Sequence, residues 1–141
     1  MYTTIKNGKN NENVSSSIVT SIRDTLQKNG YCVKTNFRYP NRISSGLPIK
    51  FGNYIPDVFA YKSINDIVII DFETCGDILS SKNENIWRSM AFKTGLDFHI
   101  IVPPCCREKA KLKSRIKNIP VKIHCTNDWR NSLELSLGMS K

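Results

Sequence analysis

The sequence predicts an α/β fold in which helices cover a mixed β-sheet. In its later half, segments with the apolar spacing of helices alternate with short strand-like segments. Residues 66–73 contain four consecutive aliphatic residues, which is typical of a central strand buried on both faces. The chain has 141 residues, of which 40% are hydrophobic, so it suits one compact domain with a single core.

The first half is expected to hold a helix and three strands. Residues 1–13, rich in Asn and Lys, predict a loose arm, and the domain then covers 14–141. Apolar residues at every fourth position mark a helix: Val14, Ile18, Ile22 and Leu26. Its caps are expected among Ser15, Ser16 and Ser17, and its end at Asn29-Gly30. A loop rich in proline, glycine and serine over 40–53 separates the first of the three expected strands from the others: 31–39, 55–61 and 66–73.

The second half is expected to alternate helices and strands. Helices are predicted at 83–94, at 105–118 and from 128 onward, and strands at 98–102 and 120–125. The complete order is then α-β-β-β-α-β-α-β-α, which suits a mixed sheet with right-handed crossovers and a C-terminal β-α extension.

The charge balance points to a polyanionic partner. Lys and Arg number 21 against 12 Asp and Glu, which gives a net charge of +9. Such a surplus favours nucleic acid, although a basic surface can also serve solubility alone. No run of about 18 apolar residues predicts a membrane span, and the polar start lacks a signal peptide. We therefore expect an intracellular, cytoplasmic protein without a membrane partner.

The cysteines do not predict a disulfide framework. They number five, and Cys105 and Cys106 are adjacent, so a reducing compartment suits them. Both could join His124 and Cys125 as zinc ligands. No C-x-x-C spacing is present, however, and His124 and Cys125 point to opposite faces if that segment is a strand, which disfavours zinc.

Acidic residues gather at the end of the predicted central strand. Asp71 and Glu73 are two positions apart, so their side chains face the same way. Asp57, after Pro56 on the preceding strand, would lie beside Asp71 in a short hairpin. Three converging carboxylates would suit Mg²⁺ or Mn²⁺. The alternative is that Asp71 merely ends the strand and Glu73 is solvated.

The pattern of Pro56-Asp57, a spacer and then Asp71-x-Glu73 resembles the PD-(D/E)xK nuclease superfamily. The group includes restriction endonucleases and archaeal Holliday-junction resolvases. The resemblance implies a restriction endonuclease-like α-β-β-β-α-β core over residues 14 to 102, an order that the residues also predict independently. It implies DNA as substrate, Mg²⁺ or Mn²⁺ as cofactor, and, as is common among such enzymes, a homodimer. It also assigns Asp57 and Asp71 as metal ligands.

Glu73 departs from the superfamily pattern, which usually has lysine there. Some restriction enzymes place glutamate at this position and still cut DNA. The lysine's role must then pass to a second metal or to another cation, for which Arg88 and Lys93 are the nearest candidates; either can also be an ordinary surface cation. The first helix also lacks the superfamily's frequent glutamate, since Glu12 precedes it and Asp24 falls late.

In an active enzyme, Asp57, Asp71 and Glu73 would hold one or two divalent ions against the scissile phosphate. Glu73 or a substrate phosphate could accept the proton of the attacking water. Two further groups of cations could contact nucleic acid, although each could equally be ordinary surface: Arg107, Lys111 and Arg115 on the 105–118 helix, and Arg38, Arg42 and Lys50 beside Tyr39, Phe51 and Tyr54 in the long loop.

Three functions remain open from the sequence. The first is a metal-dependent nuclease acting on DNA. The second is a nuclease-fold protein without catalysis that binds nucleic acid or a protein partner, as the absent lysine suggests. The third is an assembly subunit with an unrelated α/β fold.

Overall fold

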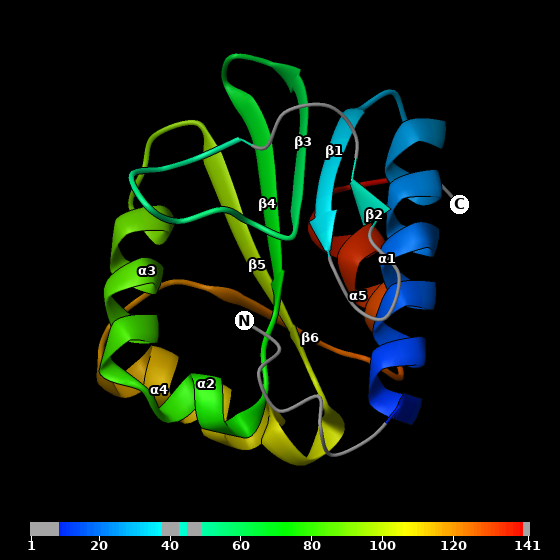
Figure 1. Cartoon of the computed structure of the whole chain (residues 1–141). Helices are drawn as coiled ribbons and strands as arrows, with labels where there is room; N and C mark the ends of the chain where they lie inside the picture. Colours follow the sequence, from blue (N-terminus) through cyan, green and yellow to red (C-terminus); the bar gives the residue numbers. More distant parts are fainter. Residues whose placement is uncertain (1–8, 38–42, 45–48, 140–141) are drawn as a thin grey trace.

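The computed structural model describes residues 9–37, 43–44 and 49–139 (Figure 1). Its elements follow the chain in this order: α1 (Lys9–Lys28), β1 (Cys32–Phe37), β2 (Ile43–Ser44), β3 (Val58–Ser63), β4 (Asp66–Phe72), α2 (Cys75–Leu79), α3 (Ser81–Ala91), β5 (Leu96–Val102), the 3₁₀ helix η2 (Pro104–Cys106), α4 (Arg107–Ile116), β6 (Lys122–Cys125) and α5 (Trp129–Ser136).

The strands form one mixed sheet of six strands in the order β2-β1-β3-β4-β5-β6. Neighbours are antiparallel from β2 to β4, whereas β4–β5 and β5–β6 are parallel. The two parallel connections contain helices, as crossovers between parallel strands require. The expectation of an α/β fold with a mixed sheet is therefore confirmed, as are the antiparallel pairing of the second and third expected strands and the C-terminal β-α extension.

Helices cover both faces of the sheet (Figure 1). Helices α1 and α5 pack on one face, where Val19, Ile22 and Leu26 of α1 join Phe72 of β4 in one core cluster. Helices α2, α3 and α4 pack on the other face and share a second cluster with alternate residues of the strands. Strand β4 contributes to both clusters, so the aliphatic run marks a central strand, as predicted.

The start of the first helix and two short elements differ from those expected. Helix α1 begins at Lys9, so the arm boundary at residue 13 and the caps at Ser15–Ser17 are wrong; residues 1–8 lie outside the described part. Residues 9–13 are all polar, so they show no apolar periodicity, but they contain no Gly or Pro that would end a helix. The long loop contains β2, and helix α2, which begins after Thr74, was not expected.

Candidate functional site

The hairpin of β3 and β4 brings Asp57 and Asp71 together. Val58 pairs with Ile70, so the register places Asp57 opposite Asp71. The amide N–H of Asp57 donates to Oδ1 of Asp71 over 2.9 Å, and the amide of Phe72 donates to Oδ2 of Asp57 over 2.9 Å. Each carboxylate thus accepts a hydrogen bond from the opposite strand, and the predicted convergence of these two side chains is present.

Both carboxylates are buried, with 1% of Asp57 and 5% of Asp71 exposed. Loss of hydration raises the pKa of Asp71 to about 6, although hydrogen bonds from the Tyr54 hydroxyl and the Asp57 amide oppose the rise. Burial, and then the neighbouring charge of Asp71, raise the pKa of Asp57 well above its ordinary value. A pair with raised pKa values is one in which a cation can replace lost hydration.

Glu73 follows β4 and faces helix α3. Its Oε2 and Oε1 accept from Nε1 of Trp87 at 3.1 and 3.3 Å, and Asn83 is a further hydrogen-bond partner. Burial and the charge of Asp71 raise its pKa to about 8. The alternative that Glu73 is a solvated end of the strand is therefore wrong, because only 3% of it is exposed.

A cation that the sequence did not single out contacts the two residues that donate hydrogen bonds to Glu73. Lys113 of α4 reaches the turn between α2 and α3, where its Nζ donates to Oδ1 of Asn83 at 3.0 Å and to the carbonyls of Ile78 and Ser80. The same ammonium lies 4.7 Å from the ring centroid of Trp87. Lys113 therefore supports both residues that hydrogen-bond Glu73. Its sequence position, as one of the three lysines of α4, gave no signal of this role.

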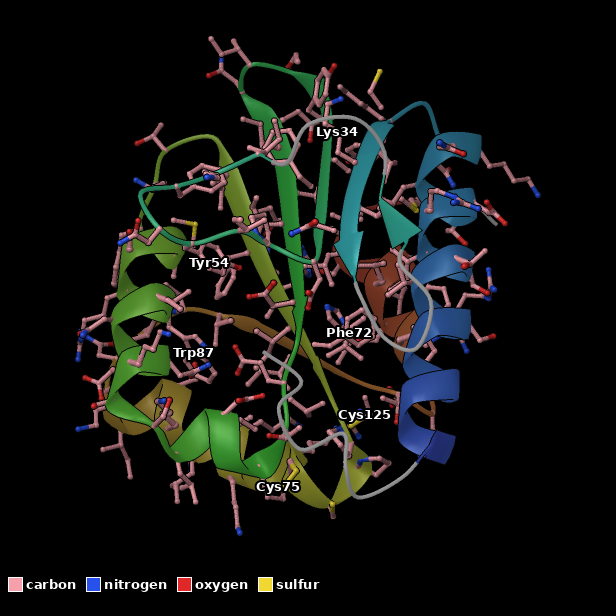
Figure 2. All side chains as sticks on the ribbon, viewed as in Figure 1. Lys34, Tyr54, Phe72, Cys75, Trp87 and Cys125 are labelled. Carbon is pink, nitrogen blue, oxygen red and sulfur yellow. A yellow bond between two sulfur atoms is a disulfide. The ribbon has the colours of Figure 1, made fainter. Side chains whose placement is uncertain are left out.

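A cavity of about 360 Å³ opens in front of the acidic residues. Asp71, Glu73 and Asp77 line it together with Tyr54 from the segment before β3 and Lys82 at the start of α3. Figure 2 shows Tyr54 and Trp87 on the α3 side of the sheet, with Phe72 on the α1 side. Asp71 and Glu73 are thus accessible from the side of the sheet that α3 partly covers.

The three predicted metal ligands are neighbours without forming a tight cluster. Among the described residues, only Cys75, Cys105 and Cys106 place three ligand atoms within 4.8 Å of one another. Asp57, Asp71 and Glu73 do not reach that spacing, because Glu73 turns toward Trp87 while Asp57 and Asp71 bind backbone amides. The carboxylate oxygens are nevertheless the ligand type that Mg²⁺ and Mn²⁺ prefer.

Neither predicted catalytic cation lies in this cavity. Arg88 points to the carbonyl of Lys117 and to Glu84, with which it forms an ion pair at 3.3 Å. Lys93 follows the C-terminal end of α3, whereas the cavity lies at its N-terminal end. The structure therefore does not bring these two residues together with Asp71 and Glu73 at the cavity. Lys82 is the lysine that lines the cavity.

The predicted nucleic-acid contacts are spread over the surface. On α4, Lys111 and Arg115 are exposed, but Arg107 pairs with Asp128 at 2.6 Å. Lys50 is exposed beside Phe51. Arg38, Tyr39 and Arg42 lie outside the described residues.

Of the predictions for the cysteines and His124, one is confirmed and one is wrong for two of the cysteines. His124 and Cys125 point to opposite faces, as predicted: Nδ1 of His124 lies 2.5 Å from Oγ of Ser132 on α5, while Cys125 joins the core on the α4 side. Cys75 and Cys106 form a disulfide, so the expectation that the cysteines stay unpaired is wrong for these two. Cys75 begins α2 and Cys106 ends η2, and these two elements are distant in the sequence but adjacent in the fold. The spacing of the cysteines in the sequence does not predict this pairing.

Comparisons of the chain with protein-family models, with curated proteins and with solved structures gave no match. None of the helices in the described ranges combines the length and hydrophobicity needed to cross a membrane. The functional argument therefore rests on the geometry of the site.

Proposed function

We propose that this protein is a metal-dependent nuclease that hydrolyses DNA phosphodiester bonds. The observation that carries the proposal is the buried set of Asp57, Asp71 and Glu73, two of which line an open cavity at the end of the central strand. The order α1-β1-β3-β4-α3-β5 supports a restriction endonuclease-like core, since it repeats the α-β-β-β-α-β order of that group once the two-residue β2 and the short α2 are set aside.

The donor set fits Mg²⁺ or Mn²⁺ in its chemistry. Asp57, Asp71 and Glu73 offer carboxylate oxygens. A divalent cation would offset the loss of hydration that raises the pKa values of all three, and the charge of Asp71 that adds to the rise at Asp57 and Glu73. When bound, such an ion supplies an acidified water and neutralises charge on the phosphate. We infer that Asp71 and Asp57 hold the ion.

Other residues would then act on the substrate. Burial raises the pKa of Glu73 to about 8, so its deprotonated form, which could accept the proton of the attacking water, predominates only above about pH 8. The water oxygen forms a bond to phosphorus as the bond to the leaving sugar oxygen breaks. Lys82, which lines the same cavity, takes the place of the missing motif lysine in neutralising phosphate charge.

The second candidate is a nuclease-fold protein that binds nucleic acid or a protein partner without cutting. The contacts of Glu73 favour it: hydrogen bonds from Trp87 and Asn83 hold the side chain as a structural acceptor, and Lys113 lies behind both. Under this alternative the net charge of +9 serves binding only.

Cleavage assays with the full chain separate the two candidates. Single-stranded, duplex and branched DNA are incubated with Mn²⁺ or Mg²⁺, and Mn²⁺ binding is measured by calorimetry. Asp71→Asn keeps an acceptor for the Asp57 amide but removes the charge, so cleavage should fall by orders of magnitude with the fold intact. Asp24→Asn, an exposed acid on α1, is the matched control. If no metal-dependent cleavage occurs, or if Asp71→Asn cuts as well as the unsubstituted chain, the nuclease proposal is wrong.

A further inference from the structure

Four aromatic side chains form a row on the α3 side of the sheet. Tyr61 and Phe59 of β3 have ring centroids 5.8 Å apart, Phe59 and Phe51 are 6.3 Å apart, and Phe51 and Tyr54 are 6.4 Å apart. All four are at least partly exposed, and Tyr61 is the most open of them at 36%. This aromatic row ends at Tyr54, whose hydroxyl donates to Asp71.

The aromatic row is flanked by hollows as well as by cations. A cavity of about 460 Å³ is lined by Phe59, Tyr61 and Lys34, and Lys34 is the cross-strand partner of Phe59. Figure 2 shows Lys34 on β1, beside this part of the sheet. A second cavity, of about 360 Å³, is lined by Phe51, Tyr54 and Lys82.

The second cavity shares Tyr54 and Lys82 with the cavity that contains Asp71 and Glu73. No acidic residue of the described part of the chain lines either of the two cavities beside the aromatic row. The carboxylates appear only at the end, around Asp71. Positive charge therefore accompanies the aromatic row up to the acidic site.

From this arrangement we infer that the aromatic row binds single-stranded nucleic acid and leads the strand to Asp71. Bases stack on aromatic rings in a sequence-tolerant way, while lysines beside the rings contact the phosphates. Lys34 and Lys82, which line the two cavities beside the row, supply those cations. The inference rests on the proposed function and narrows its substrate to an unpaired strand.

A duplex would not use this surface in the same way. Its bases are stacked on one another and paired, so only the backbone and the groove edges are available to protein. Partly exposed rings offer a duplex little, whereas an unpaired strand can place its bases over them. The chemistry of stacking is shared by DNA and RNA, and the experiment distinguishes them.

Fluorescence anisotropy with the full chain tests the inference in the presence of EDTA, so that binding is measured without cleavage. The probes are labelled oligothymidine, labelled oligouridine and a duplex of equal length. We expect the single strands to bind more tightly than the duplex. Tyr61→Ala should weaken the binding of oligothymidine roughly five-fold or more, and Tyr61→Phe should restore it. Lys34→Gln should weaken binding and reduce its dependence on salt.

Two matched variants control for general effects. Phe92→Ala removes an exposed aromatic ring that lines none of the three cavities, and Lys28→Gln removes an exposed lysine at the end of α1. Both should bind like the unsubstituted chain, with melting temperatures recorded for every variant. Duplex binding as tight as single-strand binding, or equal effects of Tyr61→Ala and Phe92→Ala, would overturn the inference. Loss of strand binding in Tyr61→Ala supports it even where no metal-dependent cleavage is found, an outcome that would refute only the proposed nuclease.

Discussion

Asp57 and Asp71 are joined through each other's backbone: the Asp57 amide donates to the Asp71 carboxylate, and the amide after Asp71 donates to the Asp57 carboxylate. Two buried acids that repel one another are held in place by the ladder of the hairpin that carries them. The arrangement fixes the acids without a cation, but it leaves their charge uncompensated. Stability and pH should therefore be linked at this site.

The first prediction concerns Glu73, whose pKa rises from 4.5 in its ordinary state to about 8. The native state binds the proton more tightly than the unfolded state, so this group favours folding below about pH 4.5, and that contribution is lost as pH rises through about 8. Glu73→Gln keeps an acceptor for Trp87 and carries no charge. We expect its melting temperature, relative to that of the unsubstituted chain, to rise between about pH 5 and about pH 9. A constant difference across that range would contradict the raised pKa.

The second prediction concerns Glu73→Lys, which restores the usual residue of the PD-(D/E)xK pattern. From the sequence alone, an active enzyme should tolerate the substitution partly, whereas an inactive one could gain activity. In the structure, a lysine here would leave the Trp87 N–H without its acceptor and would approach Lys113. We expect a loss of about 1–3 kcal/mol in the free energy of unfolding, measured by urea denaturation. Lys113→Met in the same chain should recover part of it; additive losses would argue against the repulsion.

The sequence was most informative about features that depend on the residues of a single element. Four aliphatic residues in β4 marked the central strand, and the carboxylates of Asp71 and Glu73 at its end marked the candidate site. Helix α2 had a local signal that was overlooked, since Thr74 and Asp77 form a capping box at its start. The contact of Lys113 with Ile78 joins residues 35 positions apart, and the pairing of Cys75 with Cys106 joins residues 31 positions apart. They depend on how α4 and η2 pack, and no spacing in the sequence encodes that.

The third prediction concerns the buried pair of His99 and His124. Nδ1 of His99 lies 2.8 Å from Nε2 of His124, and Nε2 of His99 lies 3.1 Å from Asp97. Burial, and then the neighbouring His99, lower the pKa of His124 to about 4. The unfolded state then binds the proton more tightly, so stability is present above about pH 6.5 and is lost as pH falls toward 4.

The titration of His124 should lower the free energy of unfolding by up to about 3 kcal/mol as pH falls. In His124→Gln the free energy of unfolding should fall less steeply between about pH 6.5 and pH 4 than in the unsubstituted chain. Denaturation at several pH values measures this. The titration of Asp97 lies below the pH range of this comparison. Burial would raise its pKa, but hydrogen bonds from His99 and Lys122 outweigh burial and lower the pKa to about 2. An equally steep loss in His124→Gln would mean that other groups cause the acid sensitivity.

The fourth prediction concerns the disulfide between Cys75 and Cys106, which closes a sequence separation of 31 residues. Removing such a cross-link enlarges the unfolded ensemble, so Cys75→Ala should cost about 2–4 kcal/mol under oxidising conditions. Cys32→Ala, at an exposed free cysteine, is the control. Thiol titration of the unfolded, unreduced chain should detect three thiols, Cys32, Cys105 and Cys125. Five titratable thiols would show that the pair is reduced.

The fifth prediction concerns the cations of α4 that the sequence assigned to nucleic-acid binding. Lys111 and Arg115 are exposed, whereas the Arg107 guanidinium lies 2.6 Å from the Asp128 carboxylate and is already paired. Each lysine or arginine that contacts a phosphate releases counterions, so its removal lowers the dependence of affinity on salt. Lys111→Glu with Arg115→Glu should therefore reduce the slope of binding against salt concentration, whereas Arg107→Gln should change it little. Measuring the affinity for labelled DNA at several salt concentrations tests both expectations. A slope left unchanged by the double reversal would remove Lys111 and Arg115 from the nucleic-acid surface and leave the aromatic row as the remaining candidate. A slope lowered by Arg107→Gln would show instead that Arg107 contacts phosphate despite its pairing with Asp128.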